Sequence, residues 1–331
     1  MTVVRNLVVL LALASSLAIG CNACSKQSST PETGGPGASS GAPAASTGSG
    51  GTPTTPPAAD GIAYSGALPT ATGFGRMRVA NEDRRIYTYV PTPRPARPPL
   101  VVVFHGTGAN ESDEALEAAV AELEVREVAS GAIIVAPASS ADGGVNADHD
   151  SGGPGWRFDG DPGANPDLLL VRAIIEDAKK TLGADATHVY FVGYSNGAFF
   201  TYFAAMKLAD RVAAFAENAG GLIPCGNRFD CPHTARGATS CADVLGPAPA
   251  QCKCAVSSKP FPTAKPSGRI PAGFLKHNAD DGTVSPVYTC RLAEVLGARA
   301  QVSIDGTGDH GVTNGFMGKA WAFMSSRSLA D

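Results

Sequence analysis

Phe191–Ala198 reads FVGYSNGA, an apolar run followed by one serine between two glycines. The pentapeptide G-x-S-x-G is typical of a sharp strand-to-helix turn that exposes a serine at the edge of a sheet. Small residues also cluster at many ordinary strand ends, so the pentapeptide alone does not distinguish a nucleophile from a structural serine. The residues that follow the other predicted strands provide the evidence that distinguishes the two interpretations.

Strands and helices alternate on both sides of this stretch. Alternating polarity in Arg85–Val90 predicts an antiparallel strand with one buried face. Apolar runs long enough for buried parallel strands are Leu100–Phe104, Ala132–Ala136, His188–Val192, Val212–Ala216, Ala272–Leu275 and Ala300–Ile304. Helices are expected from Ser112 to Ala129, from Pro166 to Gly183, from Asn196 onward, from Pro286 to Gly297, and around Phe316–Met324. This alternation predicts one doubly wound, mostly parallel sheet with helices on both faces.

Four of the predicted strand ends carry polar residues. They are His105–Gly108, Gly193–Gly197, His277–Asp281 and Gly306–His310. In chain order they present a donor-rich turn, a serine, a pair of aspartates and a histidine. Ligands of open α/β sheets bind beyond the carboxyl ends of the strands, and Ser, Asp, His is the chain order of the triad in the α/β-hydrolase fold.

The residue types have a chemical reason. A serine hydroxyl is a weak nucleophile unless an imidazole removes its proton. A carboxylate on the other ring nitrogen fixes the tautomer of that imidazole and stabilises its cation. We therefore expect Ser195 to be the nucleophile, His310 the general base, and Asp280 or Asp281 the acid.

The surroundings of the serine supply further candidates. The backbone N–H of Asn196, at the start of a helix, and that of Thr107 are the expected oxyanion donors. Trp156 and Tyr194 are candidate substrate-binding residues, although Trp156 is equally well explained as a core residue that closes a glycine-rich loop. His105 is expected to brace the oxyanion turn. This chemistry needs no metal or organic cofactor, and we expect none.

The motifs VVVFHGTG, FVGYSNGA, HNADDGTV and GTGDHG together resemble secreted esterases of the α/β-hydrolase superfamily. The branch that they resemble holds poly(3-hydroxybutyrate) depolymerases, feruloyl esterases and acetylxylan esterases. The resemblance extends from about Arg85 to Met324. It implies that Asp281, with Val284 three residues later, is the acid, and it leaves Asp280 as the alternative.

The chain departs from the pattern of these esterases at two points. Asn278 stands where they have a glycine. Gly311 and Val312 follow the histidine, where they often have an aromatic residue and a proline. The departures leave the expected reaction class unchanged and the substrate pocket undefined.

A cysteine-rich insertion, residues 222–268, separates two of the predicted strands. The expected domain contains six cysteines, Cys225, Cys231, Cys241, Cys252, Cys254 and Cys290. An even number of cysteines in an exported protein predicts disulfides. A zinc site is the alternative, but the spacing lacks two CxxC pairs. The pairing stays open, because six cysteines can pair in 15 ways.

The start of the chain predicts export. The apolar run Leu7–Ile19 is shorter than the ~20 residues of a membrane-spanning helix, so residues 1–20 are interpreted as a signal peptide. Leu17–Cys21, LAIGC, resembles a bacterial lipobox, which implies lipidation of Cys21; an ordinary cleaved signal is the alternative. Residues 21–60, mostly Ser, Thr, Gly, Pro and Ala, predict a disordered tether. Residues 61–331 are the expected catalytic domain.

These observations combine into one expected function. With a net charge of −4 and no long basic run, nucleic-acid binding is not expected. We expect a monomeric serine carboxylic-ester hydrolase that forms an acyl-enzyme on polymer-linked esters, either feruloyl or acetyl esters of polysaccharide or a polyhydroxybutyrate-type polyester. It would be an outer-membrane or cell-surface lipoprotein attached through its lipid anchor only, or otherwise periplasmic or secreted. The alternative is a surface-tethered, non-catalytic binding protein on a hydrolase scaffold.

Overall fold

A computed structural model of the chain describes residues 62–107, 112–140, 155–158, 161–222, 231, 233–253, 269–313 and 315–331. All of them belong to one unit, Ala59–Asp331. The expected signal peptide, Cys21 and the expected tether lie outside the described residues, as do Cys225 and Cys254, and those interpretations stay predictions.

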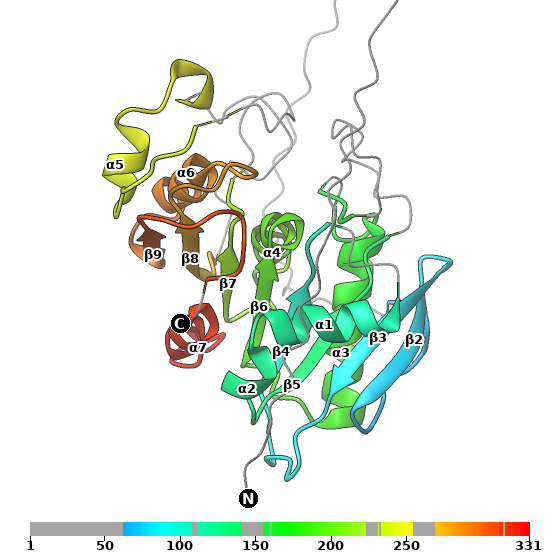
Figure 1. Cartoon of the computed structure of the whole chain (residues 1–331). Helices are drawn as coiled ribbons and strands as arrows, with labels where there is room; N and C mark the ends of the chain where they lie inside the picture. Colours follow the sequence, from blue (N-terminus) through cyan, green and yellow to red (C-terminus); the bar gives the residue numbers. More distant parts are fainter. Residues whose placement is uncertain are drawn as a thin grey trace, which may run out of the picture. The chain divides into compact units, whose positions relative to one another are not determined.

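Nine strands form a single sheet among the described residues (Figure 1). The parallel strands are β4 (Leu100–Phe104), β5 (Ile133–Pro137), β6 (Val189–Tyr194), β7 (Ala214–Asn218), β8 (Ala272–Asn278) and β9 (Ala300–Asp305). The antiparallel strands are β1 (Tyr64–Gly66), β2 (Gly73–Val79) and β3 (Glu82–Tyr89). The strand order is β1-β2-β3-β5-β4-β6-β7-β8-β9. Every residue of β4, β5, β7 and β8 is buried, as expected for parallel strands covered on both faces.

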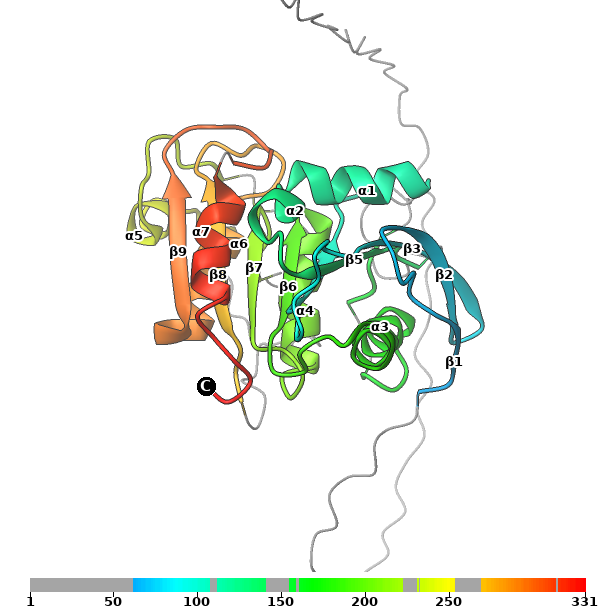
Figure 2. The same cartoon turned by 90° about the horizontal axis from the view of Figure 1, so that it is seen from below.

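Helices cover both faces of the sheet. One face packs against α3 (Pro166–Leu182), α4 (Asn196–Lys207) and α6 (Pro286–Leu296). The other face packs against α1 (Asp113–Glu122), α2 (Val125–Val128) and α7 (Phe316–Met324). Figure 2 shows α1 and α3 on opposite sides of the sheet. The predicted fold class is confirmed, and no helix within the described residues is long and apolar enough to cross a membrane.

Local signals set the ends of two helices where the sequence predicted them. Asn165 caps α3 by accepting the N–H groups of Asp167 and Leu168, and Ser285 caps α6 by accepting the N–H of Val287. In both helices a proline follows the cap, where its missing N–H costs nothing. Gly183 ends α3 with a φ of 67°, in the left-handed region that glycine adopts without strain.

The helix predicted from Ser112 to Ala129 is interrupted. Glu124, with a φ of 55°, separates α1 from α2. Leu123 is 2% exposed and Val125 is 0% exposed. Residues two apart point to different sides of a continuous helix, so the interruption lets both of them reach the core. Strands β1 and β2 were not predicted, because in β2 only Met77 and Val79 are buried.

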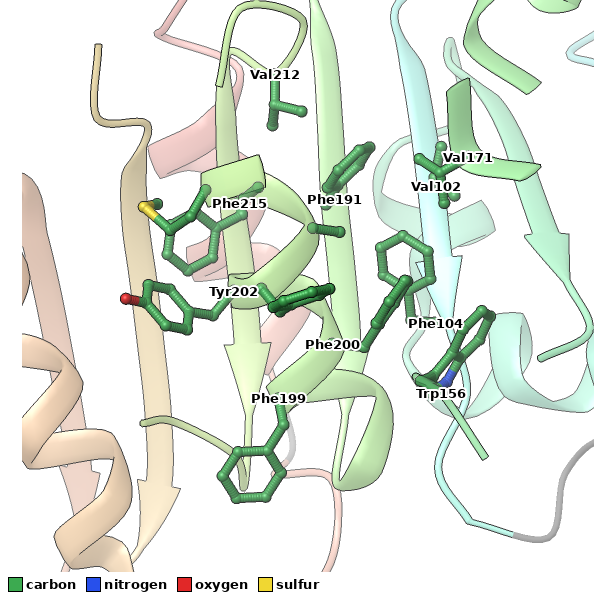
Figure 3. Close-up of a cluster of buried hydrophobic side chains, with 14 of the residues drawn as sticks. Val102, Phe104, Trp156, Val171, Phe191, Phe199, Phe200, Tyr202, Val212 and Phe215 are labelled. Carbon is green, nitrogen blue, oxygen red and sulfur yellow. The ribbon is translucent and has the colours of Figure 1, made fainter. Parts of the chain in front are cut away.

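Aromatic side chains fill the core where β4 and β6 meet α4 (Figure 3). The ring of Phe104 lies edge-on to those of Trp156, Phe191 and Phe200, at centroid distances of 5.1, 5.3 and 5.0 Å. Edge-to-face packing at these distances is favourable. Because Phe104 is the last residue of β4, this cluster anchors the turn that follows the strand.

The described part of the insertion includes α5 (Cys241–Leu245) and a short 3-10 helix, Ala250–Lys253; a second 3-10 helix, Gly297–Arg299, precedes β9. Among the described residues there are two disulfides, Cys231–Cys252 and Cys241–Cys290, which confirms the disulfide interpretation for these four cysteines. The Ala235 N–H donates to Ala279 O, and the Gly237 N–H donates to Gly306 O. The insertion therefore contacts the chain directly after β8 and β9, next to two of the four polar strand ends.

Candidate active site

Ser195 lies on the turn between β6 and α4. Its φ of 54° and ψ of −123° are strained for a residue with a side chain. A Cβ on Gly193 would overlap Thr201 Oγ1 and Gly197 O, and a Cβ on Gly197 would overlap the carbonyl oxygens of Phe104 and His105. Both glycines are therefore required by the close approach of α4 to the sheet, which gives the G-x-S-x-G pattern its physical reason.

Ser195, His310 and Asp281 form one hydrogen-bonded chain. His310 Nε2 lies 3.0 Å from Ser195 Oγ, and His310 Nδ1 lies 2.7 Å from Asp281 Oδ2. A carboxylate only accepts, so the ring proton sits on Nδ1 and leaves Nε2 free to accept the serine proton. This arrangement can activate the hydroxyl and hold the imidazolium that results.

Asp281 is held from several directions. Its Oδ1 accepts the N–H groups of Thr283 at 2.9 Å and Val284 at 2.8 Å. His277 Nε2 lies 3.3 Å from Oδ2, the same oxygen that His310 contacts. Burial alone would raise the pKa of Asp281, but the contacts from His277, His310 and Val284 hold that pKa well below its ordinary value.

The neighbouring carboxylate, Asp280, has a different partner. Its Oδ2 lies 2.5 Å from Arg236 Nη2, on the exposed side of the turn. The structure therefore places Asp281, and not Asp280, against His310.

The turn after β4 is braced by His105. Its Nε2 accepts the Ser139 N–H at 3.2 Å, so its proton sits on Nδ1, which donates to Gly106 O at 2.7 Å. Burial lowers the pKa of His105 to about 4 and keeps it neutral. A Cβ on Gly106 would lie 3.4 Å from the Cβ of Ser195. Gly106 therefore lies against the serine, and the next residue, Thr107, is exposed.

Asn196 is the first residue of α4, so its N–H has no acceptor within the helix. Its side chain accepts the Trp156 N–H at 3.2 Å. Trp156 is 0% exposed, stacks on Phe200 at a centroid distance of 4.7 Å, and donates its indole N–H to His105 O at 2.9 Å. The structure favours the core interpretation of Trp156 over the substrate-binding one, because the fully buried ring stacks on Phe200 and its indole nitrogen holds the turn after β4.

Tyr194 lies beside His310, with ring centroids 5.1 Å apart and planes tilted by 30°. Burial, with smaller contributions from Glu122 and Asp281, raises the pKa of Tyr194 to about 12. The phenol therefore stays neutral and forms a partly buried wall next to the imidazole. Its substrate-binding role stays a prediction.

Several polar residues of the site were not predicted. His277 Nδ1 lies 2.7 Å from Thr289 Oγ1, which also lies 3.2 Å from Glu217 Oε1 and 3.0 Å from Gly220 O. Asn218 and Asn278 contact the loop of His310. The sequence contained a signal for these site residues, because the otherwise apolar strands β7 and β8 both end in polar residues. Among the described residues, no group of three or more His, Cys, Asp or Glu could hold a metal ion.

No family model matches the chain. One curated relative is the bifunctional acetylxylan esterase/xylanase of Neocallimastix patriciarum, 29% identical over 154 residues. The match covers 46% of this chain and 20% of the relative, so the chain corresponds to only part of that protein.

One of two similar solved structures aligns well enough to establish the fold. A thermostable esterase aligns with a TM-score of 0.51 at 16% identity, over 78% of this chain and 63% of its own. An acetyl xylan esterase from Aspergillus awamori aligns with a TM-score of 0.46 at 18% identity, over 80% of this chain and 99% of its own. The chain has the α/β-hydrolase fold.

Proposed function

We propose that this chain, which has the α/β-hydrolase fold, is a serine hydrolase of carboxylic esters. The observation that carries the proposal is the hydrogen-bonded chain from Ser195 through His310 to Asp281, built on three strand ends. The strained backbone of Ser195 and the braced turn after β4 give further support.

The geometry supports a two-step reaction. Ser195 Oγ attacks the ester carbonyl carbon while His310 Nε2 takes the hydroxyl proton, and the N–H groups of Asn196 and Thr107 hold the oxyanion. His310 then protonates the leaving alcohol, and an acyl group stays on Ser195. Water, deprotonated by His310, attacks this acyl-enzyme, releases the acid and restores the serine.

The substrate class that we propose is an ester on a polysaccharide, with an acetyl ester preferred to a feruloyl ester. The printed activity of the curated relative, an acetylxylan esterase, supports this choice. A polyhydroxybutyrate-type polyester has no comparable support. The substrate is tested by comparing acetylated xylan, methyl ferulate and hydroxybutyrate oligomers as substrates of the purified protein.

The reaction class is tested by substituting the nucleophile. Ser195→Ala is expected to lower kcat on p-nitrophenyl acetate at least 10³-fold, because it removes the hydroxyl that His310 Nε2 contacts. The exposed Ser65→Ala is the matched control and keeps the wild-type rate. Wild-type hydrolysis by Ser195→Ala, or failure of a fluorophosphonate probe to label Ser195 in folded protein, would show the proposal to be wrong.

We also propose that the protein is exported and anchored through a lipid on Cys21. The two disulfides support export, because such bonds persist in oxidising compartments. Radioactive palmitate should label the wild-type protein in growing cells and should not label Cys21→Ala. Equal labelling of both proteins would contradict the anchor.

A further inference from the structure

The loop that carries the proposed base is rich in glycine. Residues 306–311 read GTGDHG, and Gly308 has a φ of 112°. Glycines leave a backbone with many accessible conformations. A general base must nevertheless stay within hydrogen-bond reach of the hydroxyl that it deprotonates. Contacts from outside the loop therefore have to hold His310 in place.

Asn278, the last residue of β8, packs against this loop and is 8% exposed. Its Nδ2 donates to Asp309 O at 2.8 Å, and its Oδ1 accepts from Thr313 Oγ1 at 2.9 Å. A Cβ on Gly308 would lie 3.0 Å from the amide carbon and nitrogen of Asn278. One buried side chain thus joins two points of the loop, one on each side of His310.

Asn218, the last residue of β7, makes a second contact and is 1% exposed. Its Nδ2 donates to Gly311 O at 3.1 Å. Its own carbonyl oxygen accepts the Ser195 N–H at 3.0 Å. Asn218 therefore connects the backbone of the serine turn with the backbone of the histidine loop.

We propose that Asn278 and Asn218 form an amide clamp that positions His310 between Ser195 and Asp281. The two amides donate hydrogen bonds to the carbonyl groups of residues 309 and 311, the two neighbours of the histidine. Both asparagines act through His310 and are positioning residues. The clamp proposal depends on the proposed function only in the tests that measure ester hydrolysis.

The clamp also connects the two departures noted in the sequence. Gly311, directly after His310, has no side chain to restrict the backbone, whereas Asn278 has an amide that binds the loop. The amide supplies from β8 the restraint that the loop itself lacks. The two departures are then one structural arrangement.

The first test measures hydrolysis. Asn278→Ala and Asn218→Ala are each expected to lower kcat on p-nitrophenyl acetate about ten- to hundredfold, because small displacements of a reacting group cost this much. KM should stay within about twofold. The double variant should lose more than either single variant. Wild-type kcat in the folded double variant would overturn the clamp.

A second pair of variants, which changes the structure less, tests the clamp if the alanine variants fail to fold. Thr313→Val removes the hydroxyl that donates to Asn278, and Thr313→Ser keeps it. The valine variant should lose kcat about tenfold, and the serine variant should restore most of it. Thr187→Val, in the loop before β6, is the matched control. Equal kcat values for Thr313→Val and Thr313→Ser would overturn the clamp.

A spectroscopic test does not depend on ester hydrolysis. The proton between His310 Nδ1 and Asp281 Oδ2, across 2.7 Å, should give a downfield imidazole resonance in proton NMR. That resonance should broaden in Asn278→Ala and Thr313→Val and stay sharp in Thr187→Val. A sharp resonance in all variants would overturn the clamp, whereas an unlabelled Ser195 would overturn the proposed function alone.

Discussion

At the scale of single residues, Glu217 has the least usual environment. It lies within β7, is 0% exposed, and its Oε1 accepts a hydrogen bond from Thr289. Burial raises the pKa of Glu217 to about 8, and the contacts with Thr289 and Gly220 oppose this only in part. The carboxyl group of Glu217 is therefore neutral at neutral pH in the folded protein. Thr289 Oγ1 lies between this carboxyl group and His277, which contacts Asp281.

This environment predicts a pH-dependent stability. The folded pKa of Glu217 is raised above its ordinary value of 4.5. Its contribution to stability is therefore complete at pH 4 and is lost as pH rises toward 8, by about 1.4 kcal/mol for each pH unit crossed. Glu217→Gln is neutral and of the same size, so it should lose less stability between pH 5 and pH 8. Urea denaturation at four pH values checks this; parallel curves for both proteins would contradict it.

At the scale of elements, the contact of α4 with β4 determines the serine turn. Gly197 sits where a side chain would overlap the carbonyl oxygens of Phe104 and His105. The N-terminus of α4 can approach the turn after β4 only because this position has no Cβ. Both proposed oxyanion donors, Asn196 and Thr107, lie at that contact.

Two glycine substitutions test this contact. Gly197→Ala should push α4 away from β4 and lower kcat on p-nitrophenyl acetate at least tenfold, together with a loss of stability of about 2 kcal/mol. Gly318→Ala is the control, because a Cβ there, within α7, meets nothing within 4 Å. Its higher helix propensity should raise stability by about 0.5–1 kcal/mol. Unchanged kcat and thermal midpoint in Gly197→Ala would contradict the close approach.

At the scale of the whole domain, one disulfide attaches the insertion to α6, a helix that packs on the sheet, and a second closes a loop within the insertion. The Cys241–Cys290 bond joins α5 to α6 across 49 residues of chain, and Cys231–Cys252 closes 21 residues. Segment 233–237 of the insertion also contacts the chain after β8 and β9 through its backbone. The insertion therefore stabilises the side of the sheet that carries Asp281 and His310.

The two bonds should differ in their effect on stability. In the chain-entropy model, a longer closed loop restricts the unfolded chain more. The pair Cys241→Ser and Cys290→Ser should lower the free energy of unfolding by about 4 kcal/mol, and the pair Cys231→Ser and Cys252→Ser by about 3 kcal/mol. Denaturant unfolding of both double variants checks the order. A larger loss for the shorter loop would contradict it.

The sequence by itself determined the features that depend on neighbouring residues. The buried parallel strands, the caps of α3 and α6 and the serine turn follow from hydrophobic runs, capping side chains and glycine positions, which act over a few residues. The order of Ser195, Asp281 and His310 along the chain was also visible, together with their places at strand ends.

Only the tertiary structure decided what depends on distances between remote segments. It placed Asp281 and not Asp280 against His310, paired four of the cysteines, and buried Trp156 against the turn after β4. It also brought Asn218 and Asn278 to the histidine loop, 93 and 31 residues from the carbonyl groups that they bind. Local patterns carry no information on such contacts, because the packing of the sheet and its helices sets them.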